Sequence, residues 1–100
     1  MYRLLIIDDE PAICASLSFA LEDSFVVAEA HSAAEGLQVI GSREFDVVLL
    51  DLKLGLDDGV DVLKQIKAEK PRMVVIMMTA FGSIHSSVAA MKAGAFYYLT

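Results

Sequence analysis

The sequence has little of what several protein classes require. Its single cysteine, Cys14, excludes an internal disulfide and fits a reducing cytoplasm, where we expect the protein to be. No apolar run approaches the roughly 18–20 residues that cross a bilayer, so no membrane association is expected. The short apolar run within residues 1–7 is also too brief for a signal peptide.

Positive charge is scarce as well. Eight Lys and Arg residues stand against 14 Asp and Glu residues, which gives a net charge of −6. Because proteins hold nucleic-acid phosphates mainly with Lys and Arg, we do not expect this domain to bind nucleic acid directly. Apolar residues make up 56 % of the 100 residues, which is high for a soluble chain of one domain.

Apolar runs alternate along the chain with segments of helical periodicity. The runs lie at residues 3–7, 25–28, 46–51, 73–78 and 95–99. The helical segments have predicted buried stripes at Ile13, Leu17, Ala20 and Leu21; at Ala33, Leu37 and Ile40; at Val60, Leu63 and Ile66; and at Ile84, Val88 and Met91. Pro11 suits a first helical turn, Ser32 and Glu35 have the spacing of a capping box, and Gly94 suits a helix end.

Strands that are apolar on both faces and alternate with helices indicate a parallel sheet covered on both sides. We therefore predict an α/β fold: a doubly wound parallel five-stranded sheet in the flavodoxin-like order 2-1-3-4-5. In such a sheet, ligands bind at the carboxyl ends of the strands, where the strand order reverses.

The strand ends carry the candidate site. Asp8 and Asp9 follow the first strand, Asp51 ends the third, and Thr79 follows the fourth. Crowded carboxylates need protons or a cation, and a set of oxygen ligands suits Mg²⁺. Asp51 is the natural nucleophile for phosphoryl transfer, because it stands alone at the central strand beside the glycine-containing loop 52–58. The alternative, that these acids only cap helices or solvate strand ends, suits a single acid better than this ordered set.

Several ordered motifs resemble the receiver domains of bacterial two-component response regulators. They are Asp8-Asp9-Glu10-Pro11, Asp51-Leu52-Lys53-Leu54, Asp58-Gly59, Thr79-Ala80-Phe81-Gly82 and Ala90-Met91-Lys92-Ala93-Gly94-Ala95. The resemblance covers all 100 residues and is strongest to regulators whose later domains activate transcription at enhancers.

The resemblance implies a role for each residue of the acidic site. Asp51 would accept a phosphoryl group from a sensor histidine kinase. Asp9 would bind Mg²⁺ directly and Asp8 through water, while Asp51 and the backbone carbonyl of Lys53 would complete the protein ligands. Thr79 would hydrogen-bond the phosphoryl group.

A conformational switch is also implied. Tyr98 occupies the place of the aromatic residue that turns inward when Thr79 binds the phosphoryl group. This would shift the face formed by the fourth helix and fifth strand, where Tyr97 is a surface candidate. An effector domain that regulates transcription is expected in the full-length protein. The protein would not be an enzyme beyond slow self-phosphorylation and self-dephosphorylation.

Two alternatives stay open on the sequence. A receiver-like module could act through protein contacts without being phosphorylated. A hydrolytic phosphatase that uses an aspartyl phosphate fits less well, because Lys53 stands where such enzymes have an acid.

The sequence departs from the family pattern at several places. Gly55 stands where a proline is usual, which should loosen its loop. Cys14 stands where an arginine is frequent, and we expect a packing residue rather than a reactive thiol. His31 and His85 have no metal-ligand partner in the sequence, and we expect surface or strand-end roles for them.

The last departure concerns the carboxyl end. The family has a lysine just after the position of Thr100 and a fifth helix beyond it, and residues 1–100 contain neither. We therefore interpret residues 1–100 as a receiver domain truncated at its carboxyl end. A sheet without that helix should expose apolar surface, so self-association of the truncated chain is expected.

Overall fold

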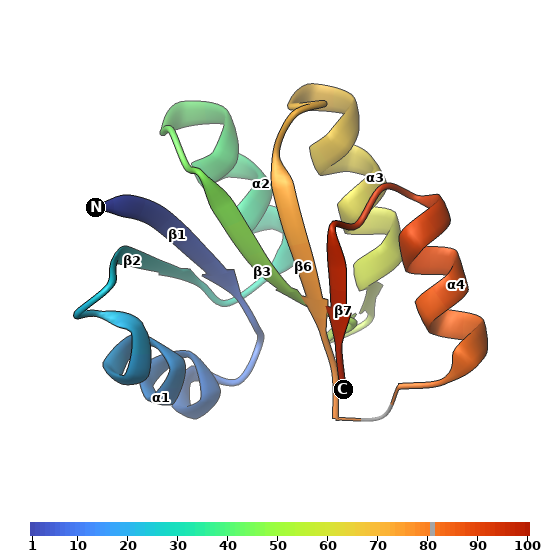
Figure 1. The fold of residues 1–100 in the computed structure, drawn as a ribbon, viewed down its shortest axis with the longest axis horizontal. Coiled ribbons are helices and arrows are strands. Elements are labelled where there is room, and N and C mark those ends of the chain that lie inside the picture. The colour runs from blue at the N-terminus through green and yellow to red at the C-terminus, as the bar shows by residue number, and fades with distance from the viewer. Residues whose placement is uncertain (81) are drawn as a thin grey trace.

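A computed structural model describes residues 1–80 and 82–100. The central sheet contains five parallel strands: β1 (Tyr2–Ile7), β2 (Phe25–Ala30), β3 (Val47–Asp51), β6 (Val74–Met78) and β7 (Tyr97–Leu99). Their order, β2-β1-β3-β6-β7, confirms the predicted doubly wound topology (Figure 1). Phe81, one residue of the motifs quoted above, lies outside the described residues.

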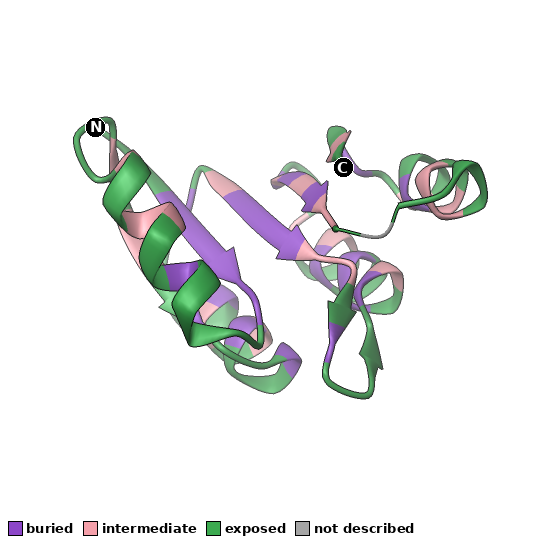
Figure 2. Cartoon of the chain, turned by 90° about the horizontal axis from the view of Figure 1, so that it is seen from below, coloured by how far each residue is buried: buried purple, intermediate pink, exposed green. Residues whose placement is uncertain are grey.

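The described residues form four helices around this sheet: α1 (Pro11–Leu21), α2 (Ala33–Ser42), α3 (Gly59–Glu69) and α4 (Ile84–Lys92). Successive side chains of each strand point to opposite faces. In β1, Leu5 and Ile7 pack in the cluster shared with α2 and α3, whereas Leu4 and Ile6 pack with Cys14 of α1. Buried residues concentrate in the central strands (Figure 2). Among the described residues, no helix has the length and apolar character needed to cross a membrane.

The segment after β3 is more ordered than the predicted loop. A short antiparallel hairpin pairs β4 (Lys53–Leu54) with β5 (Asp57–Asp58). Gly55 begins its turn at φ +63°, a left-handed conformation that the expected proline could not adopt, because its ring fixes φ near −65°. The glycine therefore belongs to a defined turn.

The predicted buried stripe of α4 is wrong. Ile84 is 85 % exposed, and Val88 and Met91 are about half exposed, whereas Ala90 is buried. Helical periodicity identifies an apolar stripe but not the side that faces the sheet. Here the small residues face inward, so the larger apolar side chains of α4 lie on the outer surface.

Helix α1 also differs in detail. Cys14 is its buried residue, while Ile13 and Ala20 of the predicted stripe are exposed. Leu17 and Leu21 are partly buried against the same cluster as Cys14. The helix covers one side of β1 and β2 and reaches less of the sheet than its sequence pattern suggests.

The start of α2 is capped differently from the predicted box. The Ser32 hydroxyl accepts a hydrogen bond from the Glu35 N–H at 3.1 Å, as expected. The Glu35 carboxylate, however, accepts from the His31 N–H at 2.6 Å instead of from Ser32. The predicted stripe holds: Ala33 and Ile40 are buried and Leu37 is half-buried.

The sheet face on the side of α1 is open over β6 and β7. Ile76 and Met78 are half-buried there, and their register partners Tyr97 and Leu99 are 56 % and 45 % exposed. Adjacent exposed apolar side chains of this kind favour contact with other apolar surfaces.

We predict that the 100-residue chain self-associates through this face and binds apolar dyes. Losing the burial of one large side chain in such a contact reduces the free energy of association by about 1.5–3 kcal/mol. Tyr97→Glu should therefore weaken association roughly tenfold or more. Sedimentation at micromolar concentrations measures this effect. Phe19→Glu, at an exposed position on α1, is the matched control and should leave association unchanged. A compact monomer that binds no dye would contradict the prediction.

Candidate functional site

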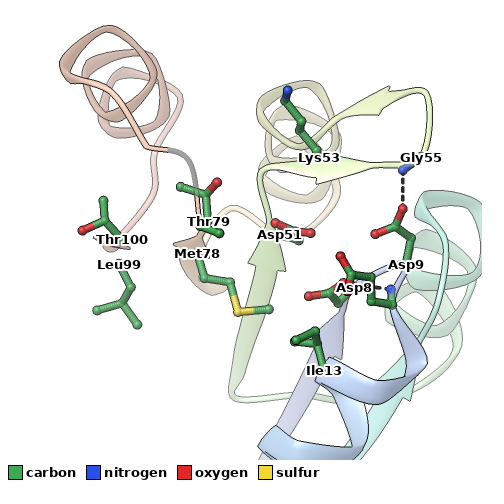
Figure 3. Close-up of a pocket in the computed structure, with 12 residues that line it drawn as sticks. Asp8, Asp9, Ile13, Asp51, Lys53, Gly55, Met78, Thr79, Leu99 and Thr100 are labelled. Carbon is green, nitrogen blue, oxygen red and sulfur yellow. Dashed lines mark hydrogen bonds between the residues drawn. The ribbon is translucent and has the colours of Figure 1, made fainter.

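The acids singled out in the sequence converge at the carboxyl ends of β1 and β3. Asp8, Asp9 and Asp51 each offer a carboxylate oxygen, and these oxygens lie within 4.8 Å of one another. Thr79 and Lys53 line the same pocket, which encloses about 400 Å³ (Figure 3). The parallel pairing of β1 with β3 brings together residues that are more than 40 positions apart in the sequence.

Backbone hydrogen bonds orient the two acids that follow β1. Asp8 is only 4 % exposed, and its Oδ1 accepts from the Glu10 N–H at 2.9 Å. The exposed Asp9 reaches across to the hairpin, where its Oδ2 accepts from the Gly55 N–H at 2.9 Å. Sequence inspection missed this contact, since only the pairing of β1 with β3 places the hairpin beside Asp9.

Asp51 is positioned by a close approach of the backbone of α3. A Cβ added to Gly59 would lie 2.3 Å from the Asp51 carbonyl oxygen and 2.7 Å from that of Leu52. The Gly59 N–H donates to the Leu52 carbonyl at 2.6 Å. Only glycine fits here, and the Asp58-Gly59 motif therefore has a steric cause that its place in the sequence did not reveal.

Burial and crowding raise the proton affinity of the site. Burial, followed by the negative charge of Asp8, raises the pKa of Asp51 to about 6, although the N–H groups of Lys53 and Leu52 oppose the shift. The pKa of Asp8 is also raised, mainly by burial and further by its acidic neighbours. A divalent cation would offset this repulsion, and closely spaced carboxylate oxygens are ligands suited to Mg²⁺.

Lys53 contributes to the pocket in a limited way. Its exposed side chain points away from the three carboxylates (Figure 3). The ammonium group therefore does not neutralise them in this structure. The predicted ligand is the Lys53 backbone carbonyl, and that role stays a prediction.

The two switch residues lie at the carboxyl ends of neighbouring strands, Thr79 directly after β6 and Tyr98 in β7. Thr79 lines the acidic pocket, and its N–H donates to the Leu99 carbonyl at 3.0 Å. Tyr98 packs against the core cluster that includes residues of α2 and α3, and its hydroxyl lies 2.6 Å from the Ser86 Oγ of α4. Ser83 and Ser86 form a capping box at the start of α4. The serine spacing could have revealed this box, but not its link to Tyr98.

The buried thiol of Cys14 fits the expected packing role. Burial raises its pKa to about 11, helped by the nearby negative charge of Asp8. The thiol donates a hydrogen bond to the Asp8 carbonyl at 3.4 Å. A protonated, buried thiol is a poor nucleophile.

Comparison with known proteins identifies the family. The family model described as "Response regulator receiver domain" matches residues 4–100. The chain belongs to the response regulator receiver domain family. This membership confirms the resemblance seen in the sequence, and it favours the signalling interpretation over the phosphorylation-independent module.

Three relatives place the chain within the family. The alginate biosynthesis transcriptional regulatory protein AlgB of Pseudomonas putida is 43 % identical over 97 % of this chain, which spans 22 % of that regulator's length. A response regulator structure from Burkholderia pseudomallei, with a phosphorylated aspartic acid, calcium ion and citrate, is 31 % identical, with a TM-score of 0.93 over 99 % of this chain and 59 % of its own. The Mg(2+)-BeF complex of TrrA from Thermotoga maritima is 30 % identical, with a TM-score of 0.90 over 100 % of this chain and 86 % of its own.

The raised pKa of Asp51 predicts how stability depends on pH without divalent cations. Folded Asp51 keeps its proton up to about pH 6, whereas the unfolded residue loses it near 3.8. The contribution of this group to stability is therefore present at low pH and lost as the pH rises from about 4 to about 6. Urea unfolding at stepped pH measures the effect.

Asp51→Asn is the control for this prediction, because it removes the titrating group at nearly constant size. The difference in unfolding free energy between the two proteins should change across that pH window, and millimolar Mg²⁺ should reduce the change. Parallel pH profiles for the two proteins would contradict the assigned pKa shift.

Proposed function

We propose that this domain is a phosphoacceptor switch in which Asp51 takes a phosphoryl group from a sensor histidine kinase. The observation that carries the proposal is the convergence of three carboxylates and Thr79 in one pocket at the strand ends. The family supports it, as does the phosphorylated aspartic acid of the B. pseudomallei relative.

Mg²⁺ is the proposed cofactor. Asp9 and Asp51 would hold it directly, Asp8 through water, and the Lys53 carbonyl would add a further oxygen. When bound, the cation supplies positive charge that keeps Asp51 ionised and offsets the charge of the incoming phosphoryl group. The Gly55 N–H keeps Asp9 directed across the pocket before any ligand binds.

Asp51 would be the nucleophile in the phosphoryl transfer. Its carboxylate oxygen attacks the phosphorus of a phosphohistidine, so that an O–P bond forms as the N–P bond breaks and the kinase imidazole leaves. Water later hydrolyses the acyl phosphate and restores the carboxylate. Both steps end at Asp51 itself, so the domain is proposed as a slow self-modifying switch and not as an enzyme with a separate substrate.

Thr79 would connect the site to the output surface. Its hydroxyl would hydrogen-bond the phosphoryl group and move toward Asp51, which opens space for Tyr98 to leave Ser86 and turn inward. Helix α4 contacts β7, and its outer side, with Ile84, Val88 and Met91, would present this change to an effector. We propose that the effector regulates transcription in the cytoplasm, while this acidic domain does not itself contact nucleic acid.

Phosphorylation should be specific to Asp51 and should require the cation. The natural protein containing these residues, treated with a small phosphodonor and Mg²⁺, should gain one phosphoryl group on Asp51, as located by mass spectrometry. Asp51→Asn should abolish the reaction, and Asp9→Ala should reduce it by about tenfold or more, because lost charge stabilisation typically costs that much. Asp46→Asn, at an exposed acid before β3, is the control. Phosphate on another residue, with Asp51 unmodified, would overturn the proposal.

The coupling to α4 can be separated from the chemistry. Thr79→Ala should still allow phosphorylation, but amide hydrogen exchange in residues 84–92 should no longer respond to it. Ser86→Ala should release the Tyr98 hydroxyl, so exchange in the same residues should rise before phosphorylation. Ser87→Ala serves as the control, since the Ser87 Oγ donates to the Ile84 carbonyl within the same helix. An equal response in Thr79→Ala and the unmodified protein would contradict this route.

A further inference from the structure

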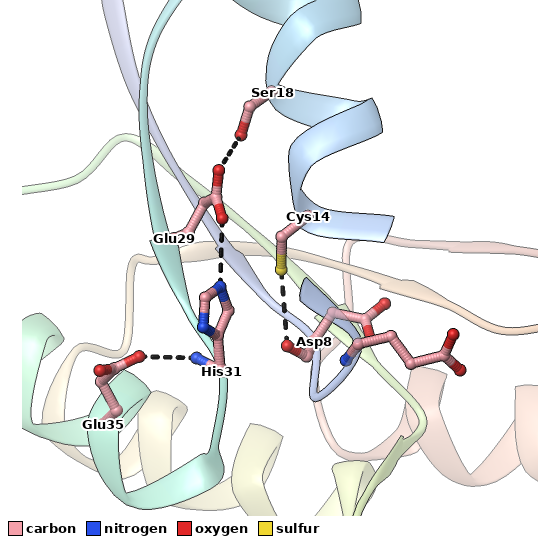
Figure 4. Close-up of polar contacts among 7 residues, drawn as sticks. Asp8, Cys14, Ser18, Glu29, His31 and Glu35 are labelled. Atoms are coloured by element: carbon pink, nitrogen blue, oxygen red, sulfur yellow. Dashed lines mark hydrogen bonds and ion pairs between the residues drawn. The ribbon is translucent and has the colours of Figure 1, made fainter. Parts of the chain in front are cut away.

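A second group of metal-ligating side chains lies outside the acidic pocket. Cys14 of α1, Glu29 of β2 and His31, which directly follows β2, each offer one ligand atom, and these atoms lie within 4.8 Å of one another. The spacing along the sequence does not reveal the group, because α1 contributes one member, whereas β2 and the residue after it contribute the other two (Figure 4). This corrects the expectation that His31 lacks a metal-ligand partner.

The polar contacts hold Glu29 and His31 in place. Their Oε1 and Nε2 atoms are 3.1 Å apart, close to the roughly 3.3 Å between oxygen and nitrogen ligands of a tetrahedral zinc ion. The other Glu29 oxygen accepts from the Ser18 hydroxyl at 2.7 Å. The His31 N–H donates to Glu35 Oε1 at 2.6 Å, which fixes the backbone beneath the ring.

The arrangement allows an ion to enter from solvent. The side chains of His31 and Glu29 are 45 % and 32 % exposed, whereas Cys14 is buried beneath them. An ion would therefore meet the carboxylate and imidazole first and the sulfur last. Small rotations of the two exposed side chains would bring their ligand atoms to bonding distance from the ion.

We propose that Cys14, Glu29 and His31 form a binding site for a borderline-soft divalent cation, with Zn²⁺ as the best match. One sulfur, one nitrogen and one oxygen ligand, with a water in the fourth position, is a donor set that zinc accepts and Mg²⁺ does not. The Cys14 thiol loses its proton to solvent when the sulfur–metal bond forms, and its hydrogen bond to the Asp8 carbonyl is lost. Ser18 acts as a positioning residue for the Glu29 carboxylate.

The experiment must separate this site from the acidic pocket. The protein is titrated with Co²⁺ and then Zn²⁺ in the Asp9→Asn/Asp51→Asn background with millimolar Mg²⁺ present, so that the acidic pocket does not contribute. Co²⁺ should produce the near-ultraviolet charge-transfer absorption of a thiolate–cobalt bond with one equivalent bound, and Zn²⁺ should displace it. Absence of the thiolate band would overturn the proposal.

Variants assign the individual ligands. Cys14→Ser should remove the charge-transfer band. The exposed changes His31→Gln and Glu29→Gln, which leave the core intact, should each weaken Zn²⁺ binding by about tenfold or more. Ser18→Ala should weaken it by about tenfold through Glu29. His85→Gln, on α4, is the matched control and should bind as the parent does. Unchanged affinity in both His31→Gln and Glu29→Gln would overturn the site.

Discussion

The repulsion among three carboxylates at the ends of two neighbouring strands is the constraint on which the functional part of this structure depends. Parallel pairing of β1 with β3 holds Asp8 and Asp51 close together. Burial removes water that would otherwise screen the repulsion between their charges. This unfavourable repulsion is confined to one edge of the sheet, while both faces of β1 and β3 are well packed. Unfavourable local electrostatics within an otherwise consistent fold is typical of a site prepared for a ligand.

Backbone geometry determines where these charges lie. Gly59 lets the start of α3 approach the Asp51 carbonyl at a distance that no side chain permits. Gly55, in a left-handed turn, directs its N–H toward Asp9 from the other side. The two glycines thus help to position Asp51 and Asp9 through the main chain. The site is organised before a cation or phosphoryl group is present, which reduces the reorganisation that binding would require.

Most of the architecture could be predicted, because apolar strands and the acids that follow them are visible as local patterns in the sequence. Parallel pairing then places the strand-end acids at one edge of the sheet. The orientation of α4 could not, since Ile84, Val88 and Met91 have helical spacing whether they face the sheet or the solvent. The hairpin at residues 53–58 is too short to show strand periodicity. The group of Cys14, Glu29 and His31 exists only through the packing of α1 on β2, which no spacing within the sequence expresses.

The two groups of ligands differ in chemistry yet share a structural element. The acidic pocket offers oxygen alone, whereas the second group adds sulfur and nitrogen, so the two proposed sites would prefer hard and softer cations respectively. Asp8 connects them: its carboxylate belongs to the pocket, and its carbonyl accepts from Cys14. A cation bound to the Cys14 sulfur would replace that hydrogen bond, which is made to the backbone of the same residue that carries the buried carboxylate. If that cation changes the affinity of the acidic pocket for its own cation, then binding at the pocket must change the affinity of the second group by the same factor. Coupling free energies between two sites are reciprocal.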